Sequence, residues 1–309
     1  MKIAVIDIGT NTFNLLIASV NNGNLVLEDV EKKFVFLGKG GINKNTIRKE
    51  AFEKGINTLV LFSEKAKKSG VAKIIAIATS AVRNSNNGIE FANEVFIKTG
   101  INISIISGKT EAEYIYKGAR SATKFGKSPV LLVDIGGGST EFIICNDNKI
   151  FWKQSFEIGV MRLFEKFHKN DLISNKEIKS IEDYLALQLE PLFIAVKKYE
   201  INDLIGSAGV FTSLAKIIEH RFNNSKSLIK TSEYEFNIYQ FQDIHQYLIH
   251  TTLNERLKTP GLVKQRAQVI VVGTILVNFI IYKFKVNNFK LARYALKEGV
   301  ASNYFTNLK

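Results

Sequence analysis

Two segments of this sequence are similar to each other, and their similarity limits the folds that the chain can adopt. Residues 4–17, AVIDIGTNTFNLLI, align without a gap with residues 131–144, LLVDIGGGSTEFII, at an offset of 127 residues. In both segments an apolar run ends at an aspartate, passes through a polar turn with glycine, and becomes apolar again. This pattern predicts a β-hairpin with a polar tip. The spacing is too long for a solenoid repeat and indicates two similar domains that face each other.

Alternating strands and helices follow the first hairpin. Apolar runs predict strands at 71–79 and 101–107, and segments of helical period precede, separate and follow them at 46–68, 86–100 and 108–123. Strands that alternate with helices after an antiparallel hairpin predict a mixed α/β sheet with helices on its faces.

Later segments predict the domain boundary and a C-terminal helix. The segment TKFGKSP at 123–129 is the best candidate for a linker, which places one domain at 1–124 and the other at 125–309. Residues 287–305 are expected to form a closing helix around Gly299, and a C-terminal helix at about 292–309 could pack back on the first domain.

The tip of the second hairpin has the composition of an anion site. Glycines at a strand end permit a close approach to the backbone, and successive N–H groups in such a turn form a concavity that binds anions. Asp134 and Glu141 flank the turn; they would repel a bare phosphate but suit one that arrives with a divalent cation. The alternative interpretation is a plain glycine-rich hairpin.

A second candidate anion site follows a later strand. The segment INDLIGSAGVFTSLAKIIEH at 201–220 predicts a strand, a glycine turn and a helix. A helix N-terminus behind such a turn is a frequent phosphate site. The alternative is that Gly206 and Gly209 serve packing alone.

Cysteine, histidine and hydropathy exclude several classes of protein. The single cysteine, Cys145, cannot form an internal disulfide and fits a reducing compartment. The four histidines lack the spacing of a zinc site. The longest apolar run, Val269–Tyr282, is shorter than the roughly 20 residues of a spanning helix, so we expect a buried core helix. No apolar signal segment precedes the first strand, and we expect a cytoplasmic protein.

The formal net charge of +13 and the pI near 9.5 have two interpretations. One is a solvated, lysine-rich surface. The other is attraction of a polyanion. No RNP, KH, zinc-finger or helix-turn-helix pattern is present, so we do not expect nucleic acid as the partner. A phosphate polymer or a highly phosphorylated nucleotide fits the charge equally well.

Seven motifs along nearly the whole chain resemble those of one known family. In chain order they are VIDIGTNTFNLLI, ATSAVRNSNN, ISGKTEAEYI, VDIGGGSTEFI, GSAG, RAQVIVVGTIL and ALKEGV. They resemble the exopolyphosphatase/guanosine pentaphosphate phosphatase (Ppx/GppA) family, in its short two-domain form, within the actin/Hsp70/sugar-kinase superfamily (ASKHA). The resemblance implies two ribonuclease-H-like domains (the actin-like ATPase fold) with an active-site cleft between them.

The resemblance also implies roles for individual residues. Glu111 would orient and deprotonate the attacking water, Arg83 would clamp a phosphate, and Asp134 and Glu141 would act in catalysis. A divalent cation, expected to be Mg²⁺, would be held by Asp7, Asp134 and Glu141. The residues implied to bind phosphate are Thr10, Asn11, Arg83, Gly136, Gly137, Gly138, Ser139, Thr140, Gly206, Ser207 and Gly209.

A physical argument that does not depend on the family also supports Glu111 as the base. It lies in the first turn of a predicted helix, where the helix dipole favours an ionised carboxylate. The alternative is a simple helix-start acid. Three positions depart from the family pattern: Asn14 stands where an arginine or histidine is frequent, Glu113 where a non-acidic residue is common, and Gln268 where an aspartate is frequent.

These observations predict a phosphohydrolase that releases orthophosphate from inorganic polyphosphate, guanosine pentaphosphate (pppGpp) or both. Two alternatives remain: an ATP-dependent kinase of the same superfamily, and a regulatory binder of phosphorylated nucleotides with little turnover. Homodimers are common in the family, but no segment of this sequence identifies an interface. The sequence leaves the preferred substrate, chain length, metal and oligomeric state open.

Overall fold

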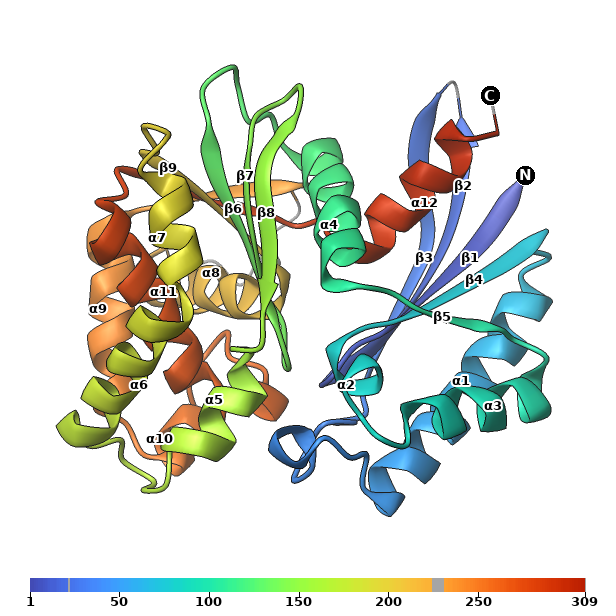
Figure 1. Ribbon diagram of the computed structural model, residues 1–309, viewed down its shortest axis with the longest axis horizontal. Helices are drawn as coiled ribbons and strands as arrows, with labels where there is room; N and C mark the ends of the chain where they lie inside the picture. The colour runs from blue at the N-terminus through green and yellow to red at the C-terminus, as the bar shows by residue number, and fades with distance from the viewer. Residues whose placement is uncertain (22, 224–230, 309) are drawn as a thin grey trace. The chain divides into compact units, whose positions relative to one another are not determined.

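The computed structural model describes residues 1–21, 23–223 and 231–308, and its internal contacts divide the chain into two compact units. Unit 1 consists of Met1–Gly118, Gly136–Gly138 and Ala295–Lys309. Unit 2 consists of Ala119–Ile135 and Ser139–Tyr294. Each unit is built on one mixed β-sheet (Figure 1).

The sheet of unit 1 has the strand order β3-β2-β1-β4-β5. The first three strands form an antiparallel meander, and β4 and β5 then add parallel to β1. The strands are β1 (Lys2–Ile8), β2 (Thr12–Asn21), β3 (Asn24–Phe34), β4 (Lys73–Ala78) and β5 (Ile103–Ile105).

Helices cover the sheet of unit 1. α1 packs against α3, and α12 packs on β1 and β2 (Figure 1). α3 ends at Gly100, whose φ of 74° is left-handed and suits glycine, as the sequence predicts. The helical elements are η1 (Ile42–Lys44), α1 (Lys49–Lys68), α2 (Ser80–Arg83), α3 (Gly88–Thr99), α4 (Gly108–Ala122, which continues into unit 2) and α12 (Leu296–Thr306).

The sheet of unit 2 has the order β10-β11-β9-β6-β7-β8. Its topology repeats that of unit 1. Strands β6, β7 and β8 form an antiparallel meander, and β9 and β11 then add parallel to β6. Strand β10 is an additional antiparallel edge strand. Both units therefore have the ribonuclease-H-like topology that the sequence predicts. The strands are β6 (Val130–Ile135), β7 (Thr140–Cys145), β8 (Ile150–Phe156), β9 (Asp203–Ser207), β10 (Glu233–Phe236) and β11 (Asn288–Ala292).

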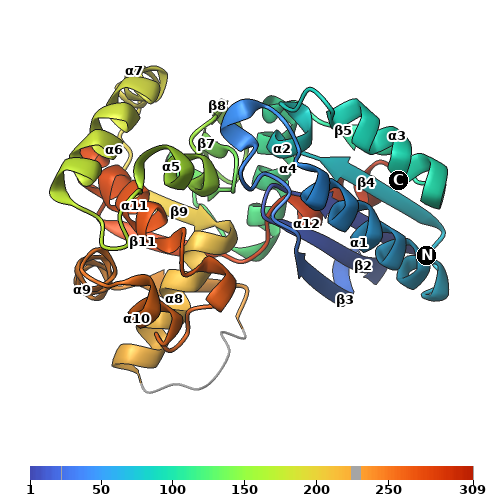
Figure 2. The ribbon, with the colours of Figure 1, turned by 90° about the horizontal axis from the view of Figure 1, so that it is seen from below.

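One helix forms the centre of the helical layer of unit 2. α11 packs against α5, α6, α8 and α9 (Figure 2), and most of its side chains are buried. This confirms the buried core helix predicted from the apolar run. No helix in the described part of the chain is long and apolar enough to cross a membrane. The helical elements are α5 (Val160–Phe167), α6 (Asn175–Gln188), α7 (Glu190–Val196), α8 (Ala208–Phe222), α9 (Ile238–Ile249), α10 (Leu253–Leu257), η2 (Lys264–Arg266) and α11 (Ile270–Phe284).

The predicted closing helix at 287–305 is wrong in its first part. Asn288–Ala292 forms strand β11, parallel to β9, and only Leu296–Thr306 is helical. The physical reason is packing: the ring of Phe289 stacks on Phe236 with centroids 4.0 Å apart and is buried. Contacts with strands distant in sequence outweigh a local helical pattern.

Candidate functional site

The tip of the first hairpin is held by the segment that follows β3. The carbonyl oxygen of Asn11 accepts hydrogen bonds from the backbone N–H of Val35 and Phe36, at 3.1 and 3.0 Å, and that of Thr10 accepts one from Gly38 at 3.1 Å. Thr10 is buried, and the side-chain oxygen of Asn11 is buried without a hydrogen-bond partner in the described part of the chain. A buried polar atom without a partner is uncommon and marks a place where a ligand could bind.

The glycines of the second tip lie directly against the first tip within unit 1. A β-carbon at Gly137 would lie 2.8 Å from Cγ of Asn11. A β-carbon at Gly138 would lie 2.7 Å from Oγ1 of Thr10 and 2.6 Å from Oγ of Ser80. A larger residue at either position would displace these side chains, so the tip glycines and the polar side chains of unit 1 form one cluster.

Ser80 is the member of this cluster that the sequence analysis missed. It is buried at the start of α2, directly after β4. It lies in the motif ATSAVRNSNN. Nothing in the local pattern distinguishes its hydroxyl from that of Ser85, which donates to the carbonyl oxygen of Ala81. Only the position of Gly138 shows that Ser80 lies at the tip.

The predicted base, Glu111, forms an ion pair with the predicted phosphate clamp, Arg83. Nη1 of Arg83 lies 2.8 Å from Oε2 of Glu111 and also donates to the carbonyl oxygen of Ile106 at 3.1 Å. Glu111 is only 6% exposed and lies in the first turn of α4, where the sequence places it. The charge-assisted bond to Arg83 orients the carboxylate and stabilises its negative charge. Glu113, two residues later, is exposed.

Asp7 lies one residue before the end of β1, opposite Asn14 on β2. Nδ2 of Asn14 donates to Oδ2 of Asp7 at 2.9 Å. Burial raises the pKa of Asp7 to about 6, although the charges of Lys297 and Lys32 and the bond from Asn14 act in the opposite direction. Asp7 therefore changes its charge close to neutral pH.

The acids of the second hairpin are held by serines on both neighbouring strands. Asp134 on β6 lies opposite Glu141 on β7, at the positions equivalent to Asp7 and Asn14. Oγ of Ser207 donates to Oδ2 of Asp134 at 2.5 Å, and Oγ of Ser155 donates to Oε1 of Glu141 at 2.6 Å. Both acids are buried. These bonds give each carboxylate one defined orientation.

Ser139, directly before β7, and Thr140, its first residue, are both buried in unit 2. The hydroxyl of Thr140 donates inward to the carbonyl oxygen of Ile158 at 3.3 Å. Its hydroxyl hydrogen is thus engaged within the unit, and its backbone pairs with Ile135 and Phe156.

The segment GSAG forms the end of β9 and the start of α8, and its two glycines have different reasons to be glycine. A β-carbon at Gly206 would overlap the ring of Phe211, so Gly206 permits packing. Gly209 lies under the guanidinium of Arg266. Between them, Ala208 has a φ of 66°, an uncommon left-handed value for a residue other than glycine. Such strain occurs frequently at functional turns.

Arg266 is a second residue that the sequence analysis missed. Its Nη1 donates to the carbonyl oxygen of Gly209 and, at 2.8 Å, to Oγ of Ser213. Burial lowers its pKa to about 10, which leaves it cationic at neutral pH. Among the residues that the structure describes, no carboxylate pairs with it. A cation beside the N-terminus of α8 makes this turn attractive to an anion.

The acids that are predicted to hold a cation do not form a complete metal site by themselves. In the described ranges no three His, Cys, Asp or Glu side chains cluster closely enough to form a metal site. Mg²⁺, however, binds proteins through one or two carboxylates and completes its shell with water and substrate phosphates. The neighbouring carboxylates of Asp134 and Glu141 fit that chemistry.

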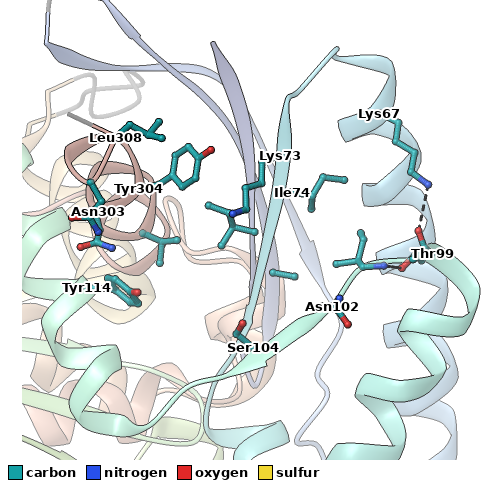
Figure 3. A pocket seen from close by; sticks show the side chains of 16 residues that line it. Lys67, Lys73, Ile74, Thr99, Asn102, Ser104, Tyr114, Asn303, Tyr304 and Leu308 are labelled. Carbon is teal, nitrogen blue, oxygen red and sulfur yellow. Dashed lines mark hydrogen bonds between the residues drawn. The ribbon is translucent and has the colours of Figure 1, made fainter.

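A cavity of about 700 Å³ lies elsewhere in unit 1 (Figure 3). Residues of β4, β5, α4 and α12 line it, and Nζ of Lys73 lies 5.3 Å from the ring centroid of Tyr304. None of the predicted site residues borders it. The cavity is therefore separate from the cluster at the hairpin tips.

Comparisons with known proteins agree on one family. The model of the Ppx/GppA phosphatase family matches residues 16–307. The crystal structure of an exopolyphosphatase from Cytophaga hutchinsonii is 35% identical, covers 100% of this chain and 99% of its own, and has a TM-score of 0.96.

Structures from Aquifex aeolicus are more distant. A PPX-GPPA enzyme is 25% identical over 98% of this chain and 99% of its own, with a TM-score of 0.82. A Ppx/GppA family member from the same organism is 24% identical over 100% and 99% of the two chains, with a TM-score of 0.83. The similarity to the structure that is 24% identical is a similarity of fold alone.

Proposed function

Because this chain belongs to the Ppx/GppA phosphatase family, we propose that it hydrolyses the terminal phosphoanhydride bond of inorganic polyphosphate and releases orthophosphate. The observation that supports this most is the buried Glu111, fixed by Arg83 in the same unit as the tip glycines 136–138. A base that is buried and oriented suits the activation of one water molecule.

The proposed reaction is an attack of water on the terminal phosphorus. Glu111 accepts a proton from the water, whose oxygen forms the new bond to phosphorus. The bridging P–O bond breaks, and the shortened polyphosphate leaves with the electron pair of that bond. Catalysis of this kind depends mainly on positioning and on stabilisation of charge.

The hairpin tips would bind the terminal phosphate. The donors that we assign to it are the backbone N–H groups of residues 136–138 and the hydroxyls of Thr10 and Ser80, which lie beside these glycines in unit 1. The side chain of Asn11 would complete the set, because a rotation of its amide exchanges its oxygen with its N–H₂ donor. Arg266 and the first turn of α8 would bind another phosphate group in unit 2.

We further propose that Asp7, Asp134 and Glu141 hold Mg²⁺ or a similar cation. The cation would neutralise charge on the phosphate oxygens. The chain's own residues define the orientation of these acids: Asn14, Ser207 and Ser155 each donate one hydrogen bond.

A second proposed substrate is pppGpp, which presents the same terminal phosphate on a short chain. The test is to measure orthophosphate release from polyphosphate, pppGpp and ATP in parallel. We expect release from polyphosphate, from pppGpp, or from both, with little release from ATP. Binding of either substrate without release would favour the regulatory alternative. Phosphate transfer from ATP to an added acceptor would favour a kinase.

Removal of the cation tests the metal assignment separately. We expect excess EDTA to abolish hydrolysis and added Mg²⁺ to restore it. Asp134→Asn and Glu141→Gln keep size but lose the charge, and each should remove most of the activity. Asp147→Asn, whose wild-type carboxylate accepts the N–H groups of Phe125 and Gly126 in unit 2, is the control. Full activity in EDTA would contradict the metal assignment and leave the fold unaffected.

A further inference from the structure

A second cavity lies in unit 2, and none of the proposed site residues lines it. Its volume is about 460 Å³, within the range of roughly 300–1,000 Å³ that is typical of small-molecule sites. The end of α5, the loop after it and α10 form most of its wall. The lining residues that matter for its chemistry are Phe164, His168, Lys169, Asp171, Arg256 and Leu257.

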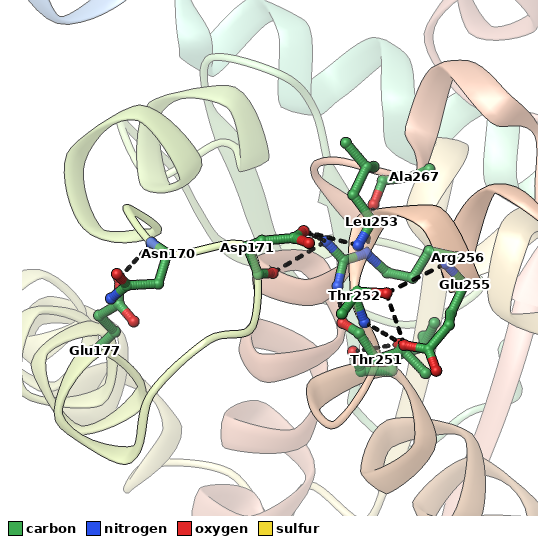
Figure 4. Close-up of polar contacts among 10 residues, drawn as sticks. Asn170, Asp171, Glu177, Thr251, Thr252, Leu253, Glu255, Arg256 and Ala267 are labelled. Atoms are coloured by element: carbon green, nitrogen blue, oxygen red, sulfur yellow. Dashed lines mark hydrogen bonds and ion pairs between the residues drawn. The ribbon is translucent and has the colours of Figure 1, made fainter.

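Arg256 places a buried positive charge in this wall. It is only 2% exposed, and it donates from Nε to the carbonyl oxygen of Ala267 at 2.8 Å and from Nη1 to that of Thr251 (Figure 4). Its acidic partner is Asp171, whose Oδ1 lies 3.8 Å from Nη2. The same Oδ1 accepts the N–H of Leu253 at 2.7 Å, and the Asp171 side chain is exposed. The buried charge is therefore only partly neutralised.

His168 is the second polar group in the wall that indicates a ligand site. It is 6% exposed, and neither ring nitrogen has a hydrogen-bond partner in the described part of the chain. The backbone of Asp171 lies near the ring and raises its pKa, but it makes no hydrogen bond of normal geometry with either nitrogen. Buried polar groups normally have partners.

The imidazole of His168 is neutral at neutral pH. Burial, followed by the charge of Arg256, lowers its pKa. A neutral ring offers one donor and one acceptor. A half-turn about the Cβ–Cγ bond exchanges each nitrogen with a ring carbon, so the ring has a second orientation with which to meet a ligand.

The remaining groups of the wall make the cavity cationic and partly apolar. Lys169 is exposed, and its Nζ donates to the carbonyl oxygen of Glu165. The nearby Glu177 carboxylate accepts the backbone N–H groups of Lys169 and Asn170 at 2.7 and 3.2 Å. Phe164 and Leu257 add apolar surface, and Leu257 is 38% exposed. Among the charged residues that line the cavity, two cations thus face one partly engaged carboxylate, beside two apolar side chains. The carboxylates of Glu177 and Glu255 lie near these groups but do not line the cavity.

We propose that this cavity binds a small organic anion that combines a carboxylate or phosphate group with an apolar body. The anionic group is attracted by Arg256 and Lys169 and accepts a hydrogen bond from His168. The apolar body packs on Phe164 and Leu257. An inorganic anion lacks the part that would cover those two side chains.

The test follows the imidazole resonances of the full chain by NMR, with His168 identified among the four histidines by His168→Gln. Phenyl phosphate and benzoate are the organic probes, and orthophosphate is the inorganic one. We expect both organic anions to shift the His168 resonances to saturation, and orthophosphate to bind at least tenfold more weakly than phenyl phosphate. Absence of a saturable shift with both organic probes, or equal binding of orthophosphate, would overturn the proposal.

A charge placed at the rim provides an independent check. Leu257→Glu should weaken phenyl phosphate binding by roughly tenfold or more through repulsion, and its exposed position limits any effect on folding. Leu187→Glu, at a leucine that is 68% exposed on α6, is the matched control and should bind as the wild type does. Unchanged binding by the Leu257 variant would also overturn the proposal.

Discussion

At the scale of single residues, Asp7 and Asp134 occupy equivalent positions in the two hairpins but have different partners. Asp134 lies opposite a second acid, Glu141, whereas Asp7 lies opposite Asn14 and accepts its amide hydrogen. The sequence alignment predicted the equivalent positions. It did not predict the serines that orient the second pair. Ser207 is 73 residues from Asp134, and the contact of Ser155 with Glu141 depends on the register between β7 and β8.

The environment of Asp7 leads to a prediction about pH. Its pKa in the folded state, about 6, lies above its ordinary value of 3.8. The stability that the neutral carboxyl provides is complete below about pH 4 and is lost as the pH rises through 6. Asp7→Asn stays neutral, so its melting temperature should exceed that of the wild type by several degrees at pH 7.5 and not at pH 4.

Differential scanning calorimetry at both pH values, without divalent cations, measures this effect. Asp29→Asn on β3, where Asp29 forms an exposed ion pair with Lys65, is the control and should not show the same gain at pH 7.5. A difference between Asp7→Asn and wild type that is equal at pH 4 and pH 7.5 would contradict the assignment of the raised pKa to Asp7.

At the scale of elements, α4 and α12 cross in unit 1 at two glycines. A β-carbon at Gly118 would overlap the carbonyl oxygen of Ala295, and one at Gly299 would overlap that of Tyr114. The sequence predicted α4 and the end of α3 because periodicity and a terminal glycine are local signals. It could not predict this crossing, nor strand β11, since both depend on partners elsewhere in the chain.

The crossing gives a prediction for Gly299→Ala. The added methyl group must separate the helices, and overpacking of this kind costs about 1–3 kcal/mol. Because Glu111 lies in the first turn of α4, we also expect the rate of hydrolysis to fall. Thermal unfolding and a rate assay measure both effects, with Ser302→Ala on the same helix as the control. A Gly299→Ala protein with wild-type stability would show that the helices separate without cost.

At the scale of the whole molecule, the repeat and the family motifs predicted two similar α/β units, and the structure has two. The first stretch of unit 1 ends at Gly118, and residues 136–138 belong to that unit. No local signal marks this grouping, because it depends on how the glycine tip packs against Thr10 and Ser80. The net charge of +13 is a property of the whole chain.

That charge predicts a strong effect of salt on polyphosphate binding. Lysines and arginines that contact a polyanion displace its counterions, so the affinity should fall by at least about tenfold between 50 and 200 mM salt. Fluorescence anisotropy with labelled polyphosphate measures the affinity, and the Glu111→Gln protein prevents hydrolysis during the titration. An affinity unchanged over this range would mean that the basic surface has no part in binding.

The most direct test of the proposed function compares Glu111→Gln with Glu113→Gln in an orthophosphate-release assay on polyphosphate. Loss of a positioned general base lowers a rate by roughly 10²–10⁴-fold, so we expect that loss for Glu111→Gln with binding within several-fold of wild type. Glu113 is exposed and lies about 200° further round α4, and its variant should retain nearly full activity. Near-normal turnover by the Glu111 variant, or an equal loss in both variants, would contradict the role of Glu111 as the base.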